Sequence, residues 1–150
     1  MRENNCLGEY MSVTQRMLNA FLRCRLEDVD ITASQVIFLM HLFKQDGQSQ
    51  EEVNRKMQYD KGVVARMAAA LEKNGYISRE NNPEDNRAYN LYLTQKATDF
   101  RPKMVEILKE WNQVLVQDED EETLKQLNSA MKRISDRSIE KVKEIRHGKK

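Results

Sequence analysis

Residues 60–80 read "DKGVVARMAAALEKNGYISRE", and this stretch decides the fold. Asp60 is a strong helix N-cap residue, and Gly75 suits the position just after a helix C-terminus. Apolar residues between them recur at helical spacing, which predicts a helix over 61–74 with one buried face. That face carries Val64, Met67, Ala68 and Leu71. The next residues, "YISRE", alternate with a period of two, which predicts a strand directly after the helix.

The opposite face of this helix combines small and basic side chains. It carries Lys61, Gly62, Ala65, Arg66, Ala69 and Lys73. Before it, Ser49 and Glu52 form a capping box that begins a short helix, and Gln58-Tyr59 supplies a break. A short helix, a tight break and a longer helix are typical of a helix-turn-helix, whose small residues let a helix enter the major groove of DNA. A helical hairpin with a solvated alanine-rich face explains the pattern equally well at this point.

A turn-rich segment, "NNPEDNRAY" at 81–89, separates the first strand from a second one, "YNLYL". Together they predict a β-hairpin, and a hairpin after a helix-turn-helix predicts a winged helix. An arginine at the tip of a wing can enter a narrow minor groove, which gives Arg87 a role. Asp85, two residues earlier, can hold that guanidinium. In isolation, a surface ion pair of little energetic value would be the simpler interpretation.

Amphipathic helices flank the winged helix on both sides. They are predicted near 5–27, from Thr94 onward, and after the acidic run "QDEDEE". Their apolar stripes are larger than a small winged helix can cover, and such stripes normally find a partner. We therefore predict a mainly α chain with a small β-hairpin wing. Residues 31–99 are expected to form a DNA-binding winged helix-turn-helix, and residues 1–30 and 100–150 a helical dimerisation region.

The composition excludes several other classes of protein. Charged residues make up 33% of the 150 residues, but the net charge is only +1, which argues against a generic polybasic coat without excluding a local basic face. No segment predicts a membrane span or a secretory signal, which suggests a cytoplasmic protein. Cys6 and Cys24 cannot build a disulfide framework or a zinc site alone, and small apolar fillers are the simpler interpretation of both. No phosphate loop, paired-histidine motif or nucleophile signature is present, so we expect no enzyme activity, no metal and no cofactor.

At this point the sequence resembles the MarR family of bacterial and archaeal transcription regulators. The matching stretches are "DITASQ", "DKGVVARMAAALEKNGYISRE" and "NPEDNRAYNLYLT", within residues 30–97. The resemblance implies a homodimer that binds a pseudo-palindromic operator, usually as a repressor. It also implies release from DNA by a small anionic aromatic ligand or by an oxidant. The positions that match DNA-contacting ones are Lys61, Gly62, Val63, Ala65, Arg66, Asp85 and Arg87.

The chain departs from the family pattern in its recognition helix. Positions 62, 63 and 65 often carry hydroxyl side chains in the family, whereas here they are Gly, Val and Ala. Base reading would then depend more on Arg66, on contacts with thymine methyl groups and on groove shape. A winged-helix module that binds proteins is the main alternative, because a fold alone does not determine function.

The resemblance also implies an effector crevice between the dimerisation helices and the DNA-binding lobe. Arg16 is the only cation among the apolar positions from Met11 to Leu22, and it could hold a ligand carboxylate. An arginine extended over a solvated face is the simpler interpretation. An oxidant sensor of the same family, built on Cys6 or Cys24, is a further alternative.

Overall fold

The computed structural model describes residues 6–83 and 85–148, excluding the side chains of Asn86 and Arg87. The elements follow the order α1 (Leu7–Arg25), α2 (Ala33–Lys44), β1 (Gln48–Ser49), α3 (Gln50–Met57), α4 (Lys61–Lys73), β2 (Ile77–Asn82), β3 (Asp85–Leu93), α5 (Gln95–Val116) and α6 (Glu121–His147). The chain divides into two compact units, Met1–Trp111 and Asn112–Lys150. The predicted fold class, mainly helical with a small antiparallel wing, is confirmed.

Capping boxes begin α2 and α3, the two helices directly before α4. The backbone amide of Gln35 donates to Oγ1 of Thr32 at 3.4 Å, and the Thr32 amide donates back to Oε1 of Gln35 at 2.7 Å. Ser49 and Glu52 make the same reciprocal pair, at 3.2 and 2.8 Å. These bonds satisfy amides that a helix start leaves without partners, so short helices such as α3 begin at a defined residue.

The end of α4 is determined by Gly75. Its φ of +77° lies in the left-handed region that glycine adopts without steric cost. This conformation lets the Tyr76 amide donate to the Leu71 carbonyl at 2.8 Å and the Gly75 amide donate to the Glu72 carbonyl at 2.9 Å. The pair of bonds is a Schellman motif, which closes the helix and directs the chain into β2. The predicted role of Gly75 is confirmed.

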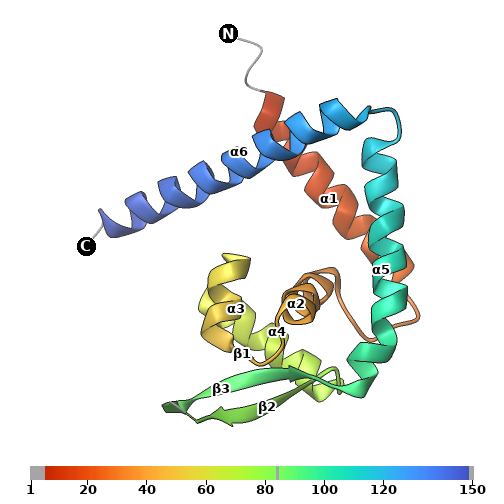
Figure 1. The fold of residues 1–150 in the computed structure, drawn as a ribbon. Helices are drawn as coiled ribbons and strands as arrows, with labels where there is room; N and C mark the ends of the chain where they lie inside the picture. Colours follow the sequence, from red (N-terminus) through yellow and green to blue (C-terminus); the bar gives the residue numbers. More distant parts are fainter. Residues whose placement is uncertain (1–5, 84, 149–150) are drawn as a thin grey trace. The chain divides into compact units, whose positions relative to one another are not determined.

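The wing is longer than the sequence indicated, and it belongs to a three-stranded sheet. The strand order is β1-β3-β2, with both pairings antiparallel. The segment 81–89 was expected to be a loop, but most of it is strand: Asn81 pairs with Tyr89, and Asn82 pairs with Asp85 after a register irregularity. Figure 1 shows α2, α3 and α4 gathered on one side of the β2–β3 hairpin, whose tip extends past them.

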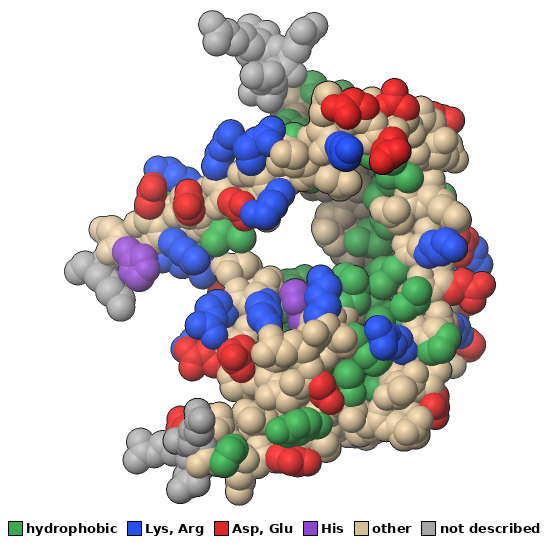
Figure 2. Space-filling model, viewed as in Figure 1, with side chains coloured by type: hydrophobic (Ala, Val, Ile, Leu, Met, Phe, Trp, Pro, Cys, Tyr) green, Lys and Arg blue, Asp and Glu red, His purple; other side chains and the backbone are tan. Residues whose placement is uncertain are grey.

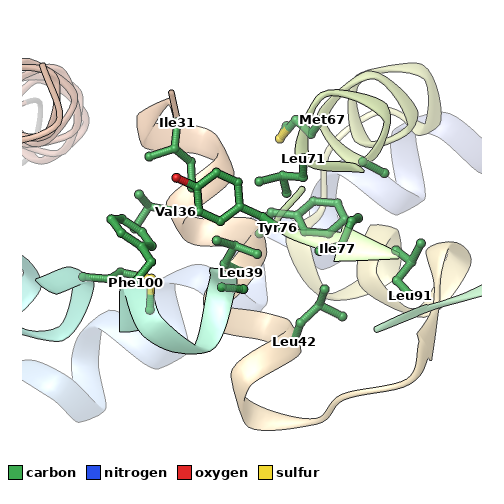
Figure 3. Close-up of a cluster of buried hydrophobic side chains, with 14 of the residues drawn as sticks. Ile31, Val36, Leu39, Leu42, Met67, Leu71, Tyr76, Ile77, Leu91 and Phe100 are labelled. Atoms are coloured by element: carbon green, nitrogen blue, oxygen red, sulfur yellow. The ribbon is translucent and has the colours of Figure 1, made fainter. Parts of the chain in front are cut away.

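One hydrophobic core holds the first unit together. The predicted inner face of α4 is buried: Val64, Ala68 and Leu71 are fully enclosed and Met67 nearly so. In Figure 3, Leu71 and Met67 lie beside Ile77 and Tyr76, and Leu39 comes from α2. The same cluster includes side chains from outside residues 31–99, namely Leu22 of α1, Leu26 at the C-cap of α1, and Phe100, Met104 and Ile107 of α5. The winged helix therefore shares its core with both flanking helices.

Polar contacts among Asp30, Tyr76 and Lys96, here called the polar junction, connect three separate segments of the chain beside this core. The hydroxyl of Tyr76 donates to the Asp30 carboxylate at 2.9 Å, and Nζ of Lys96 reaches the same carboxylate at 3.2 Å. Lys96 also lies 4.3 Å from the centre of the Tyr76 ring. Burial, followed by the bond to Asp30, raises the pKa of Tyr76 to about 12. The hydrogen bond from Tyr76, assisted by Lys96, lowers the pKa of the Asp30 carboxyl although burial acts in the opposite direction.

This junction predicts a distinctive loss of stability in alkali. The pKa of Tyr76 is higher in the folded chain than the ordinary value of 10, so its contribution is fully present below pH 10 and is lost toward pH 12. Two pKa units correspond to about 2–3 kcal/mol of unfolding free energy. We expect urea unfolding of the wild type, but not of Tyr76→Phe, to show this loss. The variant should already be less stable at neutral pH by about 1–3 kcal/mol. Parallel pH profiles would contradict the assignment.

The second unit contains the end of α5 and the long helix α6. Asp120 caps α6 by accepting a hydrogen bond from the Thr123 amide at 2.7 Å, and this bond lowers the pKa of its carboxyl. The predicted helix start within the acidic run is therefore confirmed. No side chain of α6 is buried in the single chain. Among residues 6–83 and 85–148, no helix is long and apolar enough to cross a membrane.

Candidate nucleic-acid interface

The outward face of α4 is the centre of the candidate interface. Lys61, Gly62, Arg66 and Ala69 are exposed on it, and Ala65 is half-buried. Val63 differs from the other predicted contact residues, because it is half-buried and packs against the hydrophobic core. Because one face of α4 is packed in the core, the opposite face presents a short row of small and basic side chains to solvent.

The turn between α3 and α4 contains the strained residue of the motif. Gln58 has φ +57° and ψ 24°, the left-handed conformation, and it is the C-cap of α3. Its side chain donates to the carbonyl of Arg55. Asp60 then takes the extended conformation of an N-cap, and its carbonyl accepts from the Val63 amide at 2.9 Å. The predicted start of α4 is confirmed, although the Asp60 carboxylate makes no capping hydrogen bond with the first turn.

Replacing Gln58 with glycine is expected to stabilise the protein. A non-glycine residue in the left-handed region costs about 1–2 kcal/mol. Glycine removes that cost, and its greater entropy in the unfolded chain offsets part of the gain. We expect a net increase of about 0.5–1 kcal/mol in the free energy of unfolding, measured with urea. Gln58→Ala is the matched control, since it removes the side-chain bond but keeps the strain. A variant less stable than the wild type would contradict this account.

The wing places Asp85 at the start of β3 and Arg87 two residues further along. The side chain of Arg87 lies outside the described residues, so its pairing with Asp85 stays a prediction. Asp85 lines a groove of about 490 Å³ between the wing and the start of α3. The groove also includes Ser49, Gln50, Glu51, Arg79, Asn82, Ala88 and Tyr89. Tyr89 lies on the same face of β3 as Leu91. Leu91 is fully buried and Tyr89 is 49% exposed, so this face of the strand emerges from the core toward the tip of the wing.

An ion pair that sequence reasoning missed links the wing to α4. Nε of Arg79 on β2 lies 3.1 Å from Oε2 of Glu72, although the two are not aligned as a hydrogen bond. The Arg79 side chain is only 25% exposed, so water screens this pair less than the pairs Arg25–Glu110, Lys96–Asp30 and Lys103–Asp28. A helical and a strand residue of opposite charge seven positions apart give no recognisable local pattern.

The winged helix has little net charge with which to attract DNA. Residues 31–99 contain equal numbers of basic and acidic residues. In Figure 2, Lys and Arg side chains are interspersed with Asp and Glu on the face in view. Binding must therefore depend on a few well-placed cations instead of a broad basic surface.

The residues considered for sensing are spread over the helices. Arg16 is exposed on α1, and its guanidinium donates to Oγ of Ser12 at 2.7 Å. It does not line the groove of about 450 Å³ between α1 and α2, where Arg23 is the basic residue.

Burial, followed by the charges of Lys44 and Lys56, lowers the pKa of the His41 side chain on α2. The thiol of Cys24 is free on an exposed residue, and that of Cys6 is free on a half-buried one. Within the described part of the chain, no group of three or more His, Cys, Asp or Glu is placed to hold a metal ion.

A helix-turn-helix followed directly by a β-hairpin defines a winged-helix protein, and comparison with known proteins identifies its family. A family model described as the MarR family matches residues 31–89. The HTH-type transcriptional regulator BilQ of Clostridium symbiosum is 26% identical over 125 residues, which cover 83% of this chain and 87% of BilQ. The match identifies residues 31–89 as a winged helix-turn-helix of the MarR family, whose members are DNA-binding transcriptional regulators and not enzymes.

Solved structures agree with this assignment. A MarR transcriptional regulator from Methanosarcina mazei Go1 superimposes with a TM-score of 0.83 at 27% identity, covering 89% of this chain and 96% of that one. A mutant MarR from E. coli, crystallised with operator DNA, gives a TM-score of 0.78 at 22% identity, covering 88% and 95% of the two chains. The family assignment favours DNA over a protein partner as the ligand of the winged helix.

Proposed function

We propose that this regulator is a homodimer that binds a pseudo-palindromic operator and represses transcription from it. The observation that carries the proposal is the exposed start of α4, where Lys61 and Arg66 stand on a helix whose other face is buried. A helix mounted in this way can enter a major groove, while the adjacent hairpin brings Asp85 and Arg87 toward the neighbouring minor groove. A regulator of this kind works on the chromosome, which in bacteria and archaea places it in the cytoplasm.

The dimerisation part of the proposal rests on exposed apolar side chains of the flanking helices. On α1 these are Leu7, Tyr10, Met11, Val13 and Met17, and on α6 they are Leu127, Met131, Val142 and Ile145. Amphipathic helices with such faces normally bury them in a partner. A second copy of the chain presents the same surfaces, and a dimer with two-fold symmetry matches the symmetry of a pseudo-palindromic operator.

Binding to DNA can be tested by fluorescence anisotropy with labelled duplex from upstream of the gene, over a series of salt concentrations. We expect affinity for this duplex to exceed that for random duplex and to fall steeply with salt, because phosphate contacts release counterions. Arg87→Ala should weaken binding about 5- to 150-fold, as for other specific base or groove contacts. Lys109→Ala, an exposed cation on α5, is the matched control and should bind as the wild type does. Equal binding of upstream and random duplex would contradict an operator at that position.

We further propose that a small anionic aromatic ligand releases the DNA. Arg16 is the candidate for holding its carboxylate, since a guanidinium can bind a carboxylate bidentately. The groove between α1 and α2 offers a second cation, Arg23, beside the apolar Leu26 and Ile31. A ligand that fixes another spacing of the two recognition helices would weaken binding to half-sites one turn apart.

Benzoate is a suitable first probe of the effector. We expect it to lower operator affinity of the wild type, with the response reduced in Arg16→Ala. Arg23→Ala serves as the comparison, because a reduced response there would locate the ligand in the α1–α2 groove instead. An unchanged affinity of the wild type for DNA at saturating concentrations of benzoate and related anions would argue against ligand release.

Oxidant sensing is the second candidate for regulation, because Cys24 is an exposed free thiol. A hydroperoxide would then release operator DNA from the wild type but not from Cys24→Ser. Release of both proteins to the same extent would remove this candidate.

A further inference from the structure

The polar junction lies at the C-terminal end of α4, opposite the end that the proposed function places in the major groove. Asn74 is the C-cap of α4, and its side-chain amide donates to the backbone carbonyl of Asp30 at 2.6 Å. The Asp30 carboxylate accepts from the Tyr76 hydroxyl at 2.9 Å, and in Figure 3 this hydroxyl points toward Ile31, the neighbour of Asp30. Asp30, in the connection between α1 and α2, therefore binds the end of α4 through both its backbone and its side chain.

Lys96 brings the start of α5 to the same place. Its Nζ donates to the backbone carbonyl of Asn74 at 2.7 Å and lies 3.2 Å from the Asp30 carboxylate. Thr94, directly before α5, donates its hydroxyl to the carbonyl of Gly75 at 2.6 Å. The end of α4 is thus hydrogen-bonded to both chain segments that lead to the flanking helices α1 and α5.

These bonds constrain orientation in a way that the apolar core does not. The flanking helices also contact the winged helix through buried side chains such as Leu22 of α1 and Met104 of α5. Apolar contact has no preferred direction, and packed helices can slide against one another by small amounts. A hydrogen bond has a preferred angle as well as a preferred length. The polar junction therefore limits how far α4 can pivot relative to α5.

The charged side chains of the junction are well placed for this role without being essential for folding. The side chains of Asp30 and Lys96 are 53% and 48% exposed, and an ion pair screened by water contributes little to stability. Tyr76, in contrast, is almost fully buried. Loss of the Lys96 ammonium should consequently leave the fold intact while removing two of the contacts that orient α4.

We propose that Asp30 and Lys96 are positioning residues that set the half-site spacing at which the dimer binds DNA. In a dimer joined through the flanking helices, the angle between α4 and α5 in each protomer determines the separation of the two recognition helices. One added base pair moves a half-site by about 3.4 Å and rotates it by about 35°. A dimer with firmly oriented helices cannot follow this change. The assignment rests on the proposed function, since it requires a dimer bound to two half-sites.

Binding to duplexes that differ only in half-site spacing tests this assignment. The first duplex is one that the wild-type chain selects from a random pool, and one base pair is then added or removed between its half-sites. The wild type should bind the altered duplexes about 10- to 100-fold more weakly, because linked binding of two half-sites raises affinity by up to about 10²- to 10⁴-fold. The ratio of the two affinities is the spacing preference.

Lys96→Met keeps the apolar part of the side chain but loses both polar contacts. We expect it to bind the selected duplex more weakly, since loosened helices must be ordered on binding. Its spacing preference should fall at least about threefold, because α4 can adapt to other separations. Asp30→Ala should change both quantities in the same direction. A duplex with a single half-site should bind Lys96→Met as it binds the wild type, since the DNA-facing side of α4 is unchanged.

The matched control is Lys103→Met. Lys103 of α5 pairs at 2.8 Å with Asp28, in the same connection between α1 and α2, but this pair includes no residue of α4. The control should keep the wild-type spacing preference. Thermal unfolding establishes that each protein is folded, and a variant that is only less stable weakens all duplexes by one factor and leaves the ratio unchanged.

The outcomes separate this inference from the proposed function. If folded Lys96→Met and Asp30→Ala both keep the wild-type spacing preference, the junction does not set the spacing and the assignment is wrong. If Lys103→Met loses the preference as fully as Lys96→Met, the contacts at the end of α4 have no special role. If the wild type itself binds every spacing and a single half-site equally well, the proposed dimer on a pseudo-palindromic operator is contradicted.

Discussion

A variant with Leu127→Glu and Met131→Glu is expected to be monomeric and to bind operator DNA about 10²- to 10⁴-fold more weakly than the wild type. The two side chains are 46% and 39% exposed on the apolar stripe of α6 in the single chain. Burying a carboxylate in an apolar interface without a partner is strongly unfavourable, so the variant should fail to associate. A monomer engages only one half-site and loses the gain in affinity that linked binding provides.

The control for this prediction lies on the polar face of the same helix. Gln126→Glu with Ser129→Glu adds the same charge to α6 outside the apolar stripe. This variant should stay dimeric and differ from the wild type in DNA affinity only through weak long-range repulsion. Light scattering gives the oligomeric state and anisotropy gives the affinity. A dimeric Leu127→Glu, Met131→Glu protein with unchanged affinity would show that α6 is not part of the dimer interface.

The largest effect on folding is expected from Leu71→Ala. Leu71 is fully buried on the inner face of α4 and belongs to the core that joins α2, β2 and α5. Leu→Ala substitutions in well-packed cores cost about 2–5 kcal/mol through lost burial and the cavity left behind. Natural domains have only about 5–15 kcal/mol of stability, so this loss is a large part of the total.

The same substitution should affect DNA binding only through folding. Urea unfolding measures the loss of stability, and Ala69→Ser on the exposed face of α4 is the control, expected to change stability by less than about 0.5 kcal/mol. At temperatures where Leu71→Ala remains folded, its affinity for operator DNA should match that of the wild type. A change in stability below about 1 kcal/mol would contradict the described packing of α4.

The features of the fold that the sequence predicted correctly depend on residues that lie close together in the chain. The capping boxes at Thr32 and Ser49 and the glycine at position 75 act through bonds between residues no more than five positions apart. The apolar stripe of α4 is equally local, and all four predicted residues are buried. The outward face of that helix, which carries most of the candidate site, follows directly from the same periodicity.

Features that depend on long-range contacts could not be predicted in this way. The Tyr76–Asp30 and Lys96–Asp30 contacts join residues 46 and 66 positions apart, and none of the three has a distinctive neighbourhood in the sequence. Strand β1 contains two residues, too few to show a period, and exists because Gln48 and Ser49 pair with Leu91 and Asn90. Polar residues concealed the true length of the hairpin, since turn formers such as Asn81 also occupy paired positions.

Hydroxyl-radical footprinting of the duplex selected by the wild-type chain tests the central claim most directly. A dimer that places α4 of each protomer in a major groove and each wing in a minor groove should protect two symmetric half-sites. Their centres should lie about 10 base pairs apart, one turn of the double helix, with further protection on the outer side of each from the wings. A single protected half-site, or protection without two-fold symmetry, would contradict a dimeric winged-helix regulator.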